Sequence, residues 1–362
     1  MKNLFSAKLQ AKIDRLKKNK KPLTLGRVHF SSPLLLAPMS SICNAPFRLL
    51  MEELGAGGTV SELISCHGIV RKNEKTMKML YVDPKEANVG LQIFGEDENI
   101  MAEAAAVAQS FKPKFVDINM GCPVRKVVSK GGGSALLREP KKLSSFFSTI
   151  RKNLTVPLSI KIRTGWDEEN INAQEVIKIA SSEGIEFVAI HGRTRTQAYR
   201  GHANWDYLES ISSNSLLPII GNGDLHHGKK IQERLNSTNC DALMIGRAAL
   251  RNPFIFLEGL PDQSIEKDQI YFTAEDIYEV ARRLYCHLEA YVDREKVLLV
   301  QMRKHLIWLA AGFTNVSQFR DELFRATNIE DVLNISEDFF LSQSKAQKNI
   351  KDSESFMRGG HG

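Results

Sequence analysis

Short apolar runs alternate with longer segments of helical character, and this alternation limits the possible folds of the chain more than any other feature. Eight such runs lie between Pro33 and Pro253, at residues 34–37, 58–61, 89–93, 115–119, 158–162, 187–191, 218–221 and 242–245. Most are largely apolar, as strands buried on both faces of a sheet are. The pattern therefore predicts parallel strands connected by helices.

The segments between these runs carry helix signals. Residues 100–110 are rich in alanine, residues 140–152 begin with a proline, and residues 173–183 are followed by Gly184. Eight strand–helix units favour a closed (β/α)8 TIM barrel, an α/β fold that needs about 250 residues. An open doubly wound sheet is the alternative, disfavoured because no Gly-x-Gly-x-x-Gly motif follows the first strand.

The strand-like runs stop after Pro253, and helical patterns follow at residues 274–290, 296–311, 316–326 and 329–339. These patterns predict a C-terminal all-helical domain. We therefore divide the chain into a basic N-terminal extension (1–27), a barrel domain (28–259), a helical domain (260–341) and a flexible polar tail (342–362).

Charge and cysteine content narrow the class of protein. The net charge of +7 and the pI near 9.0 suit a polyanionic partner, although an ordinary soluble enzyme can carry the same balance. Five cysteines without zinc-like spacing indicate a reducing compartment and no metal site. Without a secretory signal or an apolar stretch of membrane-spanning length, we expect a cytoplasmic protein that crosses no membrane. The basic run 8–21 predicts a solvated helix, with an RNA-contacting segment or an organellar transit peptide as alternatives.

Polar residues follow or interrupt the predicted strands, and in a TIM barrel the carboxyl ends of the strands hold the active site. The residues there are Pro38, Met39, Gln92, Asn119, Cys122, Lys161 and His191. Cys122 lies on a Gly-Cys-Pro loop, where its thiol can donate a proton or act as a nucleophile. A structural cysteine would more naturally lie inside the preceding strand.

Three of these residues suggest a flavin. Taken alone, Lys161 is typical of a structural cation with a polar partner, and His191 of a hydrogen-bonded core histidine. Together with Gln92 they can bond the pyrimidine edge of a flavin, where reduction leaves negative charge that a cation stabilises.

The seventh and eighth predicted strands run into Gly-Asn-Gly-Asp (221–224) and Gly-Arg (246–247). These turns supply backbone amides and a guanidinium where TIM barrels often bind phosphate. Ordinary turn chemistry is the alternative for the first motif and chance for the second. One phosphate site without a dinucleotide motif favours FMN over a dinucleotide.

Six segments at the strand ends form a larger pattern. They are Leu-Ala-Pro-Met (36–39), Asp-Ile-Asn-Met-Gly-Cys-Pro (117–123), Gly-Gly-Gly-Ser-Ala-Leu-Leu (131–137), Ile-Lys-Ile-Arg (160–163), His-Gly-Arg-Thr-Arg (191–195) and Gly-Asn-Gly-Asp (221–224). Together they closely resemble the tRNA-dihydrouridine synthase family, and its bacterial B-type branch most of all. The resemblance covers residues 33–253 and extends into the helical domain through Arg-Lys-His-Leu (303–306), while Gly132 stands where the family more often has alanine.

The resemblance implies an FMN enzyme with Cys122 as general acid and Asn119 orienting a uracil. It implies that the flavin is held by the backbone at Pro38 and Met39 and by Gln92, Lys161 and His191. It implies a phosphate site at Asn222, Gly223, Asp224, Gly246 and Arg247. NADPH, or NADH, would reduce FMN, hydride would pass to C6 of a uridine flipped out of tRNA, and Cys122 would protonate C5.

RNA contacts are expected from two basic segments, with solvated charged surfaces as the alternative. They comprise Arg193, Arg195, Tyr199 and Arg200 in one loop, and Arg303, Lys304 and His305 on a helix that the family uses against tRNA. Ribosomal RNA is an alternative substrate, and we expect a monomer. A dihydroorotate-dehydrogenase-like FMN enzyme and a non-catalytic RNA-binding protein are the competing interpretations. The first would not need a helical domain, and the second leaves Cys122, Lys161 and His191 unexplained.

Overall fold

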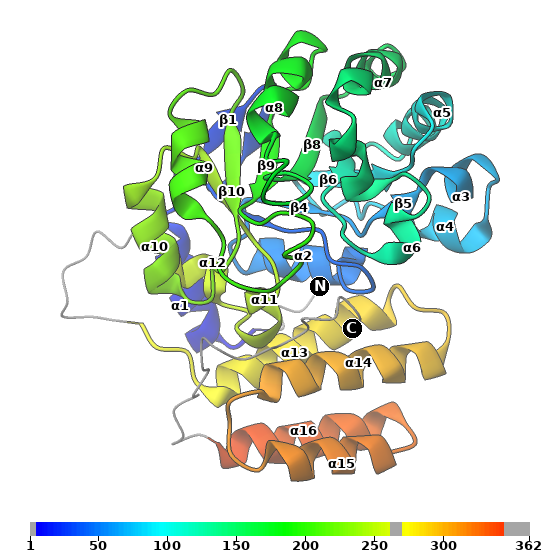
Figure 1. The fold of residues 1–362 in the computed structure, drawn as a ribbon. Helices are drawn as coiled ribbons and strands as arrows, with labels where there is room; N and C mark the ends of the chain where they lie inside the picture. The colour runs from blue at the N-terminus through cyan, green and yellow to red at the C-terminus, as the bar shows by residue number, and fades with distance from the viewer. Residues whose placement is uncertain (1–4, 261–269, 344–362) are drawn as a thin grey trace.

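The computed structural model describes residues 5–260 and 270–343. Within them, eight parallel strands close into a ring, which confirms the predicted (β/α)8 barrel (Figure 1). In order around the ring the strands are β3 (Leu34–Leu36), β4 (Gly58–Val60), β6 (Val89–Phe94), β7 (Phe115–Met120), β8 (Leu158–Arg163), β9 (Val188–His191), β10 (Ile219–Asn222) and β11 (Ala242–Ile245). The ring closes because β3 pairs with both β4 and β11. A short strand, β5 (Ile64–Ser65), also pairs with β6.

Helices connect the strands and cover the outside of the barrel (Figure 1). They are α2 (Ala45–Glu53), α3 (Cys66–Val70), α4 (Glu74–Met79), α5 (Glu98–Gln109), α6 (Arg125–Val128), α7 (Leu143–Arg151), α8 (Ala173–Ser182), α9 (Trp205–Ser212), α10 (Gly228–Ser237), α11 (Ala248–Arg251) and α12 (Ile255–Glu258). Polar side chains at Asn44, Asp97 and Asn204 cap the first turns of α2, α5 and α9 by accepting hydrogen bonds from backbone amides. The helices expected at 100–110, 140–152 and 173–183 are confirmed, the second as a short 3-10 turn (Pro140–Lys142) that leads into α7.

Alternation along the strands sorts side chains between two layers. In β8, Leu158, Ile160 and Ile162 belong to the core between the sheet and the helices. Lys161 and Arg163 occupy the alternate positions of the same strand, which face the barrel interior. The interior is apolar at the amino end of the strands and polar at their carboxyl end, so the barrel itself concentrates polar groups at one opening.

A hairpin of β1 (Leu23–Leu25) and β2 (Val28–Phe30) covers the amino end of the barrel. The Phe30 ring packs edge-on against Phe115 and Phe187, with ring centroids 6.0 Å and 5.9 Å away. The boundary that we predicted after residue 27 therefore falls inside a hairpin. A three-residue strand is too short to give a clear period-two signal, which is why the sequence did not reveal it.

The basic N-terminal run forms α1 (Ala7–Lys17), which docks on the rest of the molecule. Leu9 and Ile13 are fully buried, and Lys12 forms an ion pair with Asp276 at 2.5 Å. The backbone amide of Ser6 donates a hydrogen bond to Glu279. The expectation of a solvated helix is therefore wrong for this face, because Leu9, Ile13 and Leu16 follow one another at helical spacing and form an apolar stripe.

Among the described residues after the barrel, four helices follow as predicted: α13 (Ala274–Glu289), α14 (Glu295–Ala310), α15 (Val316–Arg325) and α16 (Ile329–Ser342). Figure 1 places α13 and α14 between the barrel and the pair formed by α15 and α16. Helix α13 starts at a capping box in which Thr273 and Asp276 satisfy each other's backbone amides. Most of the expected tail, residues 344–362, lies outside the described residues. In the described ranges, no helix combines the length and the apolar character that a membrane crossing requires.

Candidate active site

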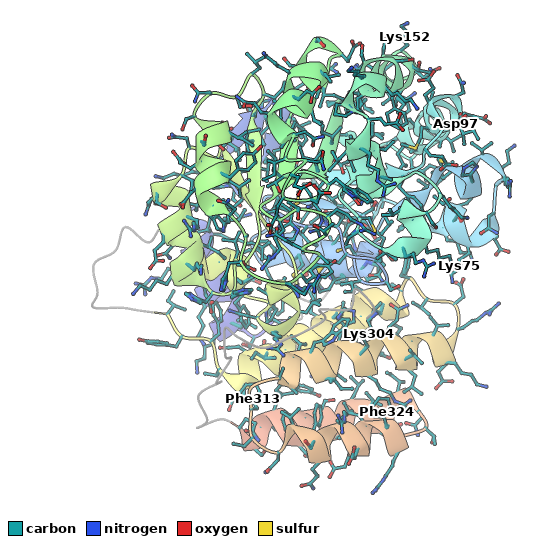
Figure 2. All side chains as sticks on the ribbon, in the orientation of Figure 1. Lys75, Asp97, Lys152, Lys304, Phe313 and Phe324 are labelled. Atoms are coloured by element: carbon teal, nitrogen blue, oxygen red, sulfur yellow. The ribbon has the colours of Figure 1, made fainter. Side chains whose placement is uncertain are left out.

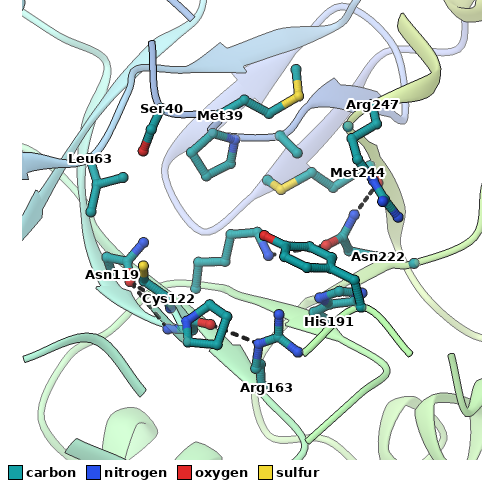
Figure 3. A pocket seen from close by; sticks show the side chains of 18 of the residues that line it. Met39, Ser40, Leu63, Asn119, Cys122, Arg163, His191, Asn222, Met244 and Arg247 are labelled. Atoms are coloured by element: carbon teal, nitrogen blue, oxygen red, sulfur yellow. Dashed lines mark hydrogen bonds between the residues drawn. The ribbon is translucent and has the colours of Figure 1, made fainter. Parts of the chain in front are cut away.

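An open cavity lies at the carboxyl end of the barrel. It brings together most of the residues that the sequence predicted. Those that line it are Pro38, Met39, Gln92, Asn119, Cys122, Lys161, His191, Tyr199, Asn222, Gly223, Asp224, Gly246 and Arg247. Figure 3 shows Asn119 and Cys122 on one side of the cavity and His191, Asn222 and Arg247 on the other. Parallel strands end at the same edge, so segments distant in sequence meet here.

Cys122 sits on the loop that leaves β7. The Asn119 side-chain oxygen accepts a hydrogen bond from the Cys122 amide at 2.9 Å, which fixes the turn (Figure 3). The Cys122 carbonyl in turn accepts from the amide and the hydroxyl of Ser134. Burial raises the pKa of the Cys122 thiol, and hydrogen bonding to the Val124 amide and the charge of Arg163 only partly oppose this. The thiol is therefore protonated at neutral pH.

A buried hydrogen-bonded chain supports that loop from inside the barrel. Ser159 and Gln92 donate to the two oxygens of Asp117, and Asn119 donates to the Gln92 oxygen at 2.7 Å. Burial raises the pKa of Asp117 to about 6, against these hydrogen bonds and the charge of Lys161. Gln92 is fully buried and bonded at both ends of its amide, so it holds Asn119 in addition to lining the cavity.

Two inward positions place a cation beside a neutral imidazole. The Lys161 nitrogen donates to Asn222 at 3.1 Å, and burial lowers the pKa of Lys161 to about 8, so it stays largely charged at pH 7. Burial, together with the charges of Arg163, Lys161, Arg193 and Arg247, lowers the pKa of His191 well below its ordinary value. His191 is therefore a neutral ring, which donates a hydrogen bond from one nitrogen and accepts one at the other.

Arg163 is a cavity residue that the sequence reasoning missed. It donates to the carbonyls of Gly121, Thr194 and Ala198, and so ties the Cys122 loop to the loop after β9. The sequence could have indicated it, because Arg163 lies two positions after the candidate Lys161, and residues two apart in a strand share a face. Further unpredicted lining residues are Leu63, His226 and Met244.

The turns after β10 and β11 form the other end of the cavity. Gly223 has φ +129, and a Cβ there would lie 2.6 Å from Ala203, so only glycine fits. At Gly246 a Cβ would meet only ordinary contacts, leaving the Gly246 backbone open to the cavity. The side chain of Asp224 is bound to Arg193 at 2.8 Å. Because this carboxylate is already paired and would repel an anion, the phosphate role predicted for Asp224 stays a prediction for its backbone alone.

Comparisons with known proteins identify the family. Residues 35–346 match the family described as dihydrouridine synthase (Dus). The chain belongs to the dihydrouridine synthase family. It is 35% identical to "tRNA-dihydrouridine synthase B" of Pasteurella multocida, over 91% of this chain and 99% of that protein. It is 36% identical to the protein of the same name from Pseudomonas syringae, over 89% and 95%. A "probable tRNA-dihydrouridine synthase" of Rickettsia prowazekii is 33% identical over 82% and 91%.

Solved structures share the fold of this dihydrouridine synthase at low identity. An amine oxidase for 6-hydroxypseudooxynicotine from Pseudomonas geniculata aligns with a TM-score of 0.52 and 11% identity, over 66% of this chain and 48% of that chain. Histamine dehydrogenase from a Rhizobium species aligns with a TM-score of 0.51 and 13% identity, over 75% and 51%. The chain thus spans about half the length of these structures, and the likeness concerns the barrel fold alone.

In the loop after β9, Arg193 does not lie where RNA could reach it. Its side chain is 3% exposed, and it bonds Asp224 and the carbonyls of Arg200 and Gly201. The prediction that Arg193 contacts RNA is therefore wrong. Arg193 instead connects the loop after β9 to the turn after β10. A buried guanidinium is stable only when nearby acceptors take its hydrogen bonds.

The other members of this loop lie nearer the surface. Arg200 is exposed, and Tyr199 lines the cavity with the Arg247 guanidinium 5.0 Å from its ring centre. Arg195 is stacked on Trp166 at 4.5 Å, and Arg138 lies 3.6 Å from the same ring. Trp166 and Arg138 were not predicted, because cation–π contacts between separate loops leave no trace in sequence spacing.

The three basic residues of α14 contact other parts of the same chain. His305 is 5% exposed and stacks on Phe47 of α2, so its predicted RNA contact is wrong. Arg303 is partly buried and donates to the Ala326 carbonyl at the end of α15. Lys304 donates to the Ser41 carbonyl of the barrel at 2.7 Å. Figure 2 places Lys304 on the barrel side of α14.

The remaining cysteines do not reach the cavity. Cys43, Cys66 and Cys240 are buried, and Cys286 is partly exposed on α13. Burial raises the pKa of Cys43 to about 12, so it is an inert packing thiol. Among the described residues, no cluster of histidines, cysteines and carboxylates could hold a metal ion.

Proposed function

We propose that this synthase reduces the C5–C6 double bond of specific uridines in tRNA to 5,6-dihydrouridine, with FMN as cofactor and NADPH as reductant. The observation that carries the proposal is the meeting of the Cys122 thiol with Lys161 and His191 in one barrel-end cavity of a family member. The names of the relatives, which specify tRNA-dihydrouridine synthases, support the choice of substrate.

The residues of the cavity fit FMN. Lys161 and Arg247 bring two cations to the cavity, and the carboxylate of Asp224, which also lines it, is paired with Arg193. The open backbone of Gly246 and the positive φ of Gly223 suit a phosphate held by main-chain amides. When bound, FMN would supply a hydride for uracil C6. Lys161 would hold positive charge beside the flavin ring, and the neutral His191 would offer a hydrogen bond without adding charge.

Cys122 would supply the proton. Its thiol keeps its hydrogen at neutral pH because burial raises the pKa, and the loop bonds to Asn119 and Ser134 hold it at the cavity. Proton transfer to uracil C5 would leave a thiolate, which regains a proton from water after product release. NADPH would supply the two electrons for each turnover. A positioned acid of this kind contributes about 10²–10⁴ to the rate.

RNA would approach over the loops at the cavity mouth. Arg200 is exposed there, and the guanidinium of Arg195 lies over the Trp166 ring, 4.5 Å from its centre. Tyr199 offers a ring on which a flipped base can stack. Contacts of this kind with phosphates weaken as salt rises.

The proposal is tested with purified protein, FMN, NADPH and unmodified tRNA transcripts. We expect a yellow protein that NADPH bleaches, and dihydrouridine at defined tRNA positions by mass spectrometry. Ribosomal RNA transcripts and free dihydroorotate run in parallel. Turnover of either one in place of tRNA would overturn the tRNA assignment. A colourless protein that binds tRNA but takes up no FMN would overturn the enzymatic one.

A further inference from the structure

One face of α14 rests on the barrel loop that follows β3. Gln301 accepts a hydrogen bond from Asn44 at 2.9 Å, and Lys304 donates to the Ser41 carbonyl. The ring centres of His305 and Phe47 lie 5.3 Å apart. Positions 301, 304 and 305 share one side of a helix. This side of α14 therefore belongs to the interface between the barrel and the helical domain.

That barrel loop is also a wall of the cavity. Met39 and Ser40 line the cavity, directly before Ser41. The Met39 carbonyl accepts the amides of Ile42 and Cys43, so the segment is one compact turn. A displacement of Ser41 would therefore move the backbone that faces the cofactor.

Ser41 adopts a backbone conformation that needs support. Its φ of 61° lies in the left-handed region, which non-glycine residues adopt at a cost. Both of its backbone groups are held from outside the loop: the amide donates to Glu62 and the carbonyl accepts from Lys304. Glu62 comes from the barrel, whereas Lys304 is the contribution of the helical domain.

The ammonium group of Lys304 points toward the Ser41 carbonyl. It lies over the Trp308 ring at 5.0 Å from the ring centre and bonds Ser41 at 2.7 Å. Burial lowers the pKa of Lys304, while the charge of Glu62 opposes that shift. Lys304 is thus a partly buried cation between two elements, with the Glu62 carboxylate nearby. An RNA phosphate contact would require an outward-facing group.

We propose that Lys304 is a positioning residue for the cofactor, which fixes the turn of residues 38–41 through the Ser41 carbonyl. This rests on the proposed function, because it assumes that FMN occupies the cavity. It makes the helical domain a part of the flavin site, since α14 also packs against α11, which follows Arg247 of the cavity. The flavin environment would then respond to the placement of the helical domain.

The test compares Lys304→Met and Lys304→Arg with Lys296→Met, a matched change at an exposed lysine on the same helix. The first readout is the FMN dissociation constant with the visible flavin spectrum. The second is hydrogen exchange of the peptide covering residues 38–46 in FMN-free protein. The third is tRNA affinity.

For Lys304→Met we expect FMN affinity to fall about tenfold, the scale of one charge-assisted hydrogen bond, and exchange in the 38–46 peptide to accelerate. Lys304→Arg should restore both, and Lys296→Met should change neither. Unchanged FMN affinity and exchange in Lys304→Met would overturn the proposal, and a specific loss of tRNA affinity would reassign Lys304 to the RNA. A wild-type protein that binds no FMN would overturn the proposed function, and the cofactor role of Lys304 with it.

Discussion

The barrel-end cavity and the interface between the barrel and α13 and α14 both gather basic residues, but they use them in opposite ways. In the cavity, Lys161, Arg163 and Arg247 face a common space. At the domain interface, Arg283 and His287 of α13 close on Glu53 of α2. The cavity cations surround a space that a ligand could enter, whereas the interface cations form ion pairs within the protein.

The difference lies in which element carries the cation. Along a strand of a closed barrel, side chains alternate between the outside and the interior, so every second side chain points to the interior. A helix packed on a second domain turns its long side chains toward acceptors on the neighbouring surface. Motif and charge therefore predicted the cavity residues well. They wrongly predicted an RNA contact for His305, although the α14 segment that carries it is also basic in sequence.

The largest expected effect is the removal of Cys122, the proposed acid, from the cavity. Cys122→Ala should lower the rate of dihydrouridine formation by about 10²–10⁴, because no other group would protonate C5. FMN binding and its reduction by NADPH should stay at the wild-type level. Rapid mixing of enzyme with NADPH, followed by tRNA, measures the two steps separately.

Cys286→Ala is the control for this variant, since Cys286 is partly exposed on α13 and should be silent. The acid must be protonated to work, and its pKa is raised by burial. Uridine reduction by the wild-type enzyme should therefore persist through neutral pH and fall on the alkaline side. A Cys122→Ala enzyme with the wild-type rate would exclude the acid role.

The next effect concerns the cavity cations. Lys161→Met removes a buried charge while keeping a side chain of similar volume. Uridine reduction should fall about 10²-fold, as it does in other enzymes that lose one preorganised donor. Stopped-flow kinetics on tRNA measures it. Lys178→Met, exposed on α8, is the matched control. Equal rates in the two variants would mean that the cavity cations, like those of the interface, serve structure alone.

The domain interface should fail through stability and pH instead. Burial tends to raise the pKa of Glu53, but hydrogen bonds from Arg283 and His287 lower it to about 2. The stabilisation is complete above the ordinary pKa of a glutamate and is lost as pH falls toward 2. Glu53→Gln should cost about 1–3 kcal/mol at pH 7, a difference that shrinks in acid.

Chemical denaturation at a series of pH values measures this effect. Glu103→Gln, an exposed position on α5, controls for the loss of one carboxylate. If Glu53→Gln and the wild type lost stability in parallel between pH 5 and pH 3, the interface pair would contribute nothing specific.

The smallest effect belongs to the cavity mouth. Arg200→Ala should weaken tRNA binding a few-fold and reduce the slope of log affinity against log salt by about 1, as the loss of one phosphate contact does. Filter binding across a salt series measures it, with Lys178→Met as control. A slope unchanged by Arg200→Ala would place the RNA elsewhere on the surface.

Much of the fold could be predicted because the local pattern and the global structure agree. Each of the eight apolar runs became a barrel strand, since a strand covered by helices must be apolar on its outer face. The hairpin at residues 23–30 and the docking of α1 were not predicted. Both depend on surfaces that distant segments provide, such as Phe115 and Asp276.

The sequence by itself determined the barrel and the polar positions at its strand ends, because strand periodicity converts residue order into direction. Cys122, Lys161 and His191 could therefore be assigned to one opening of the barrel. Only the tertiary structure decided which charges remain available. Arg193 forms an ion pair with Asp224, and Lys304 donates to the Ser41 carbonyl. Both acceptors lie on other elements of the fold, so the order of residues along the chain does not reveal them.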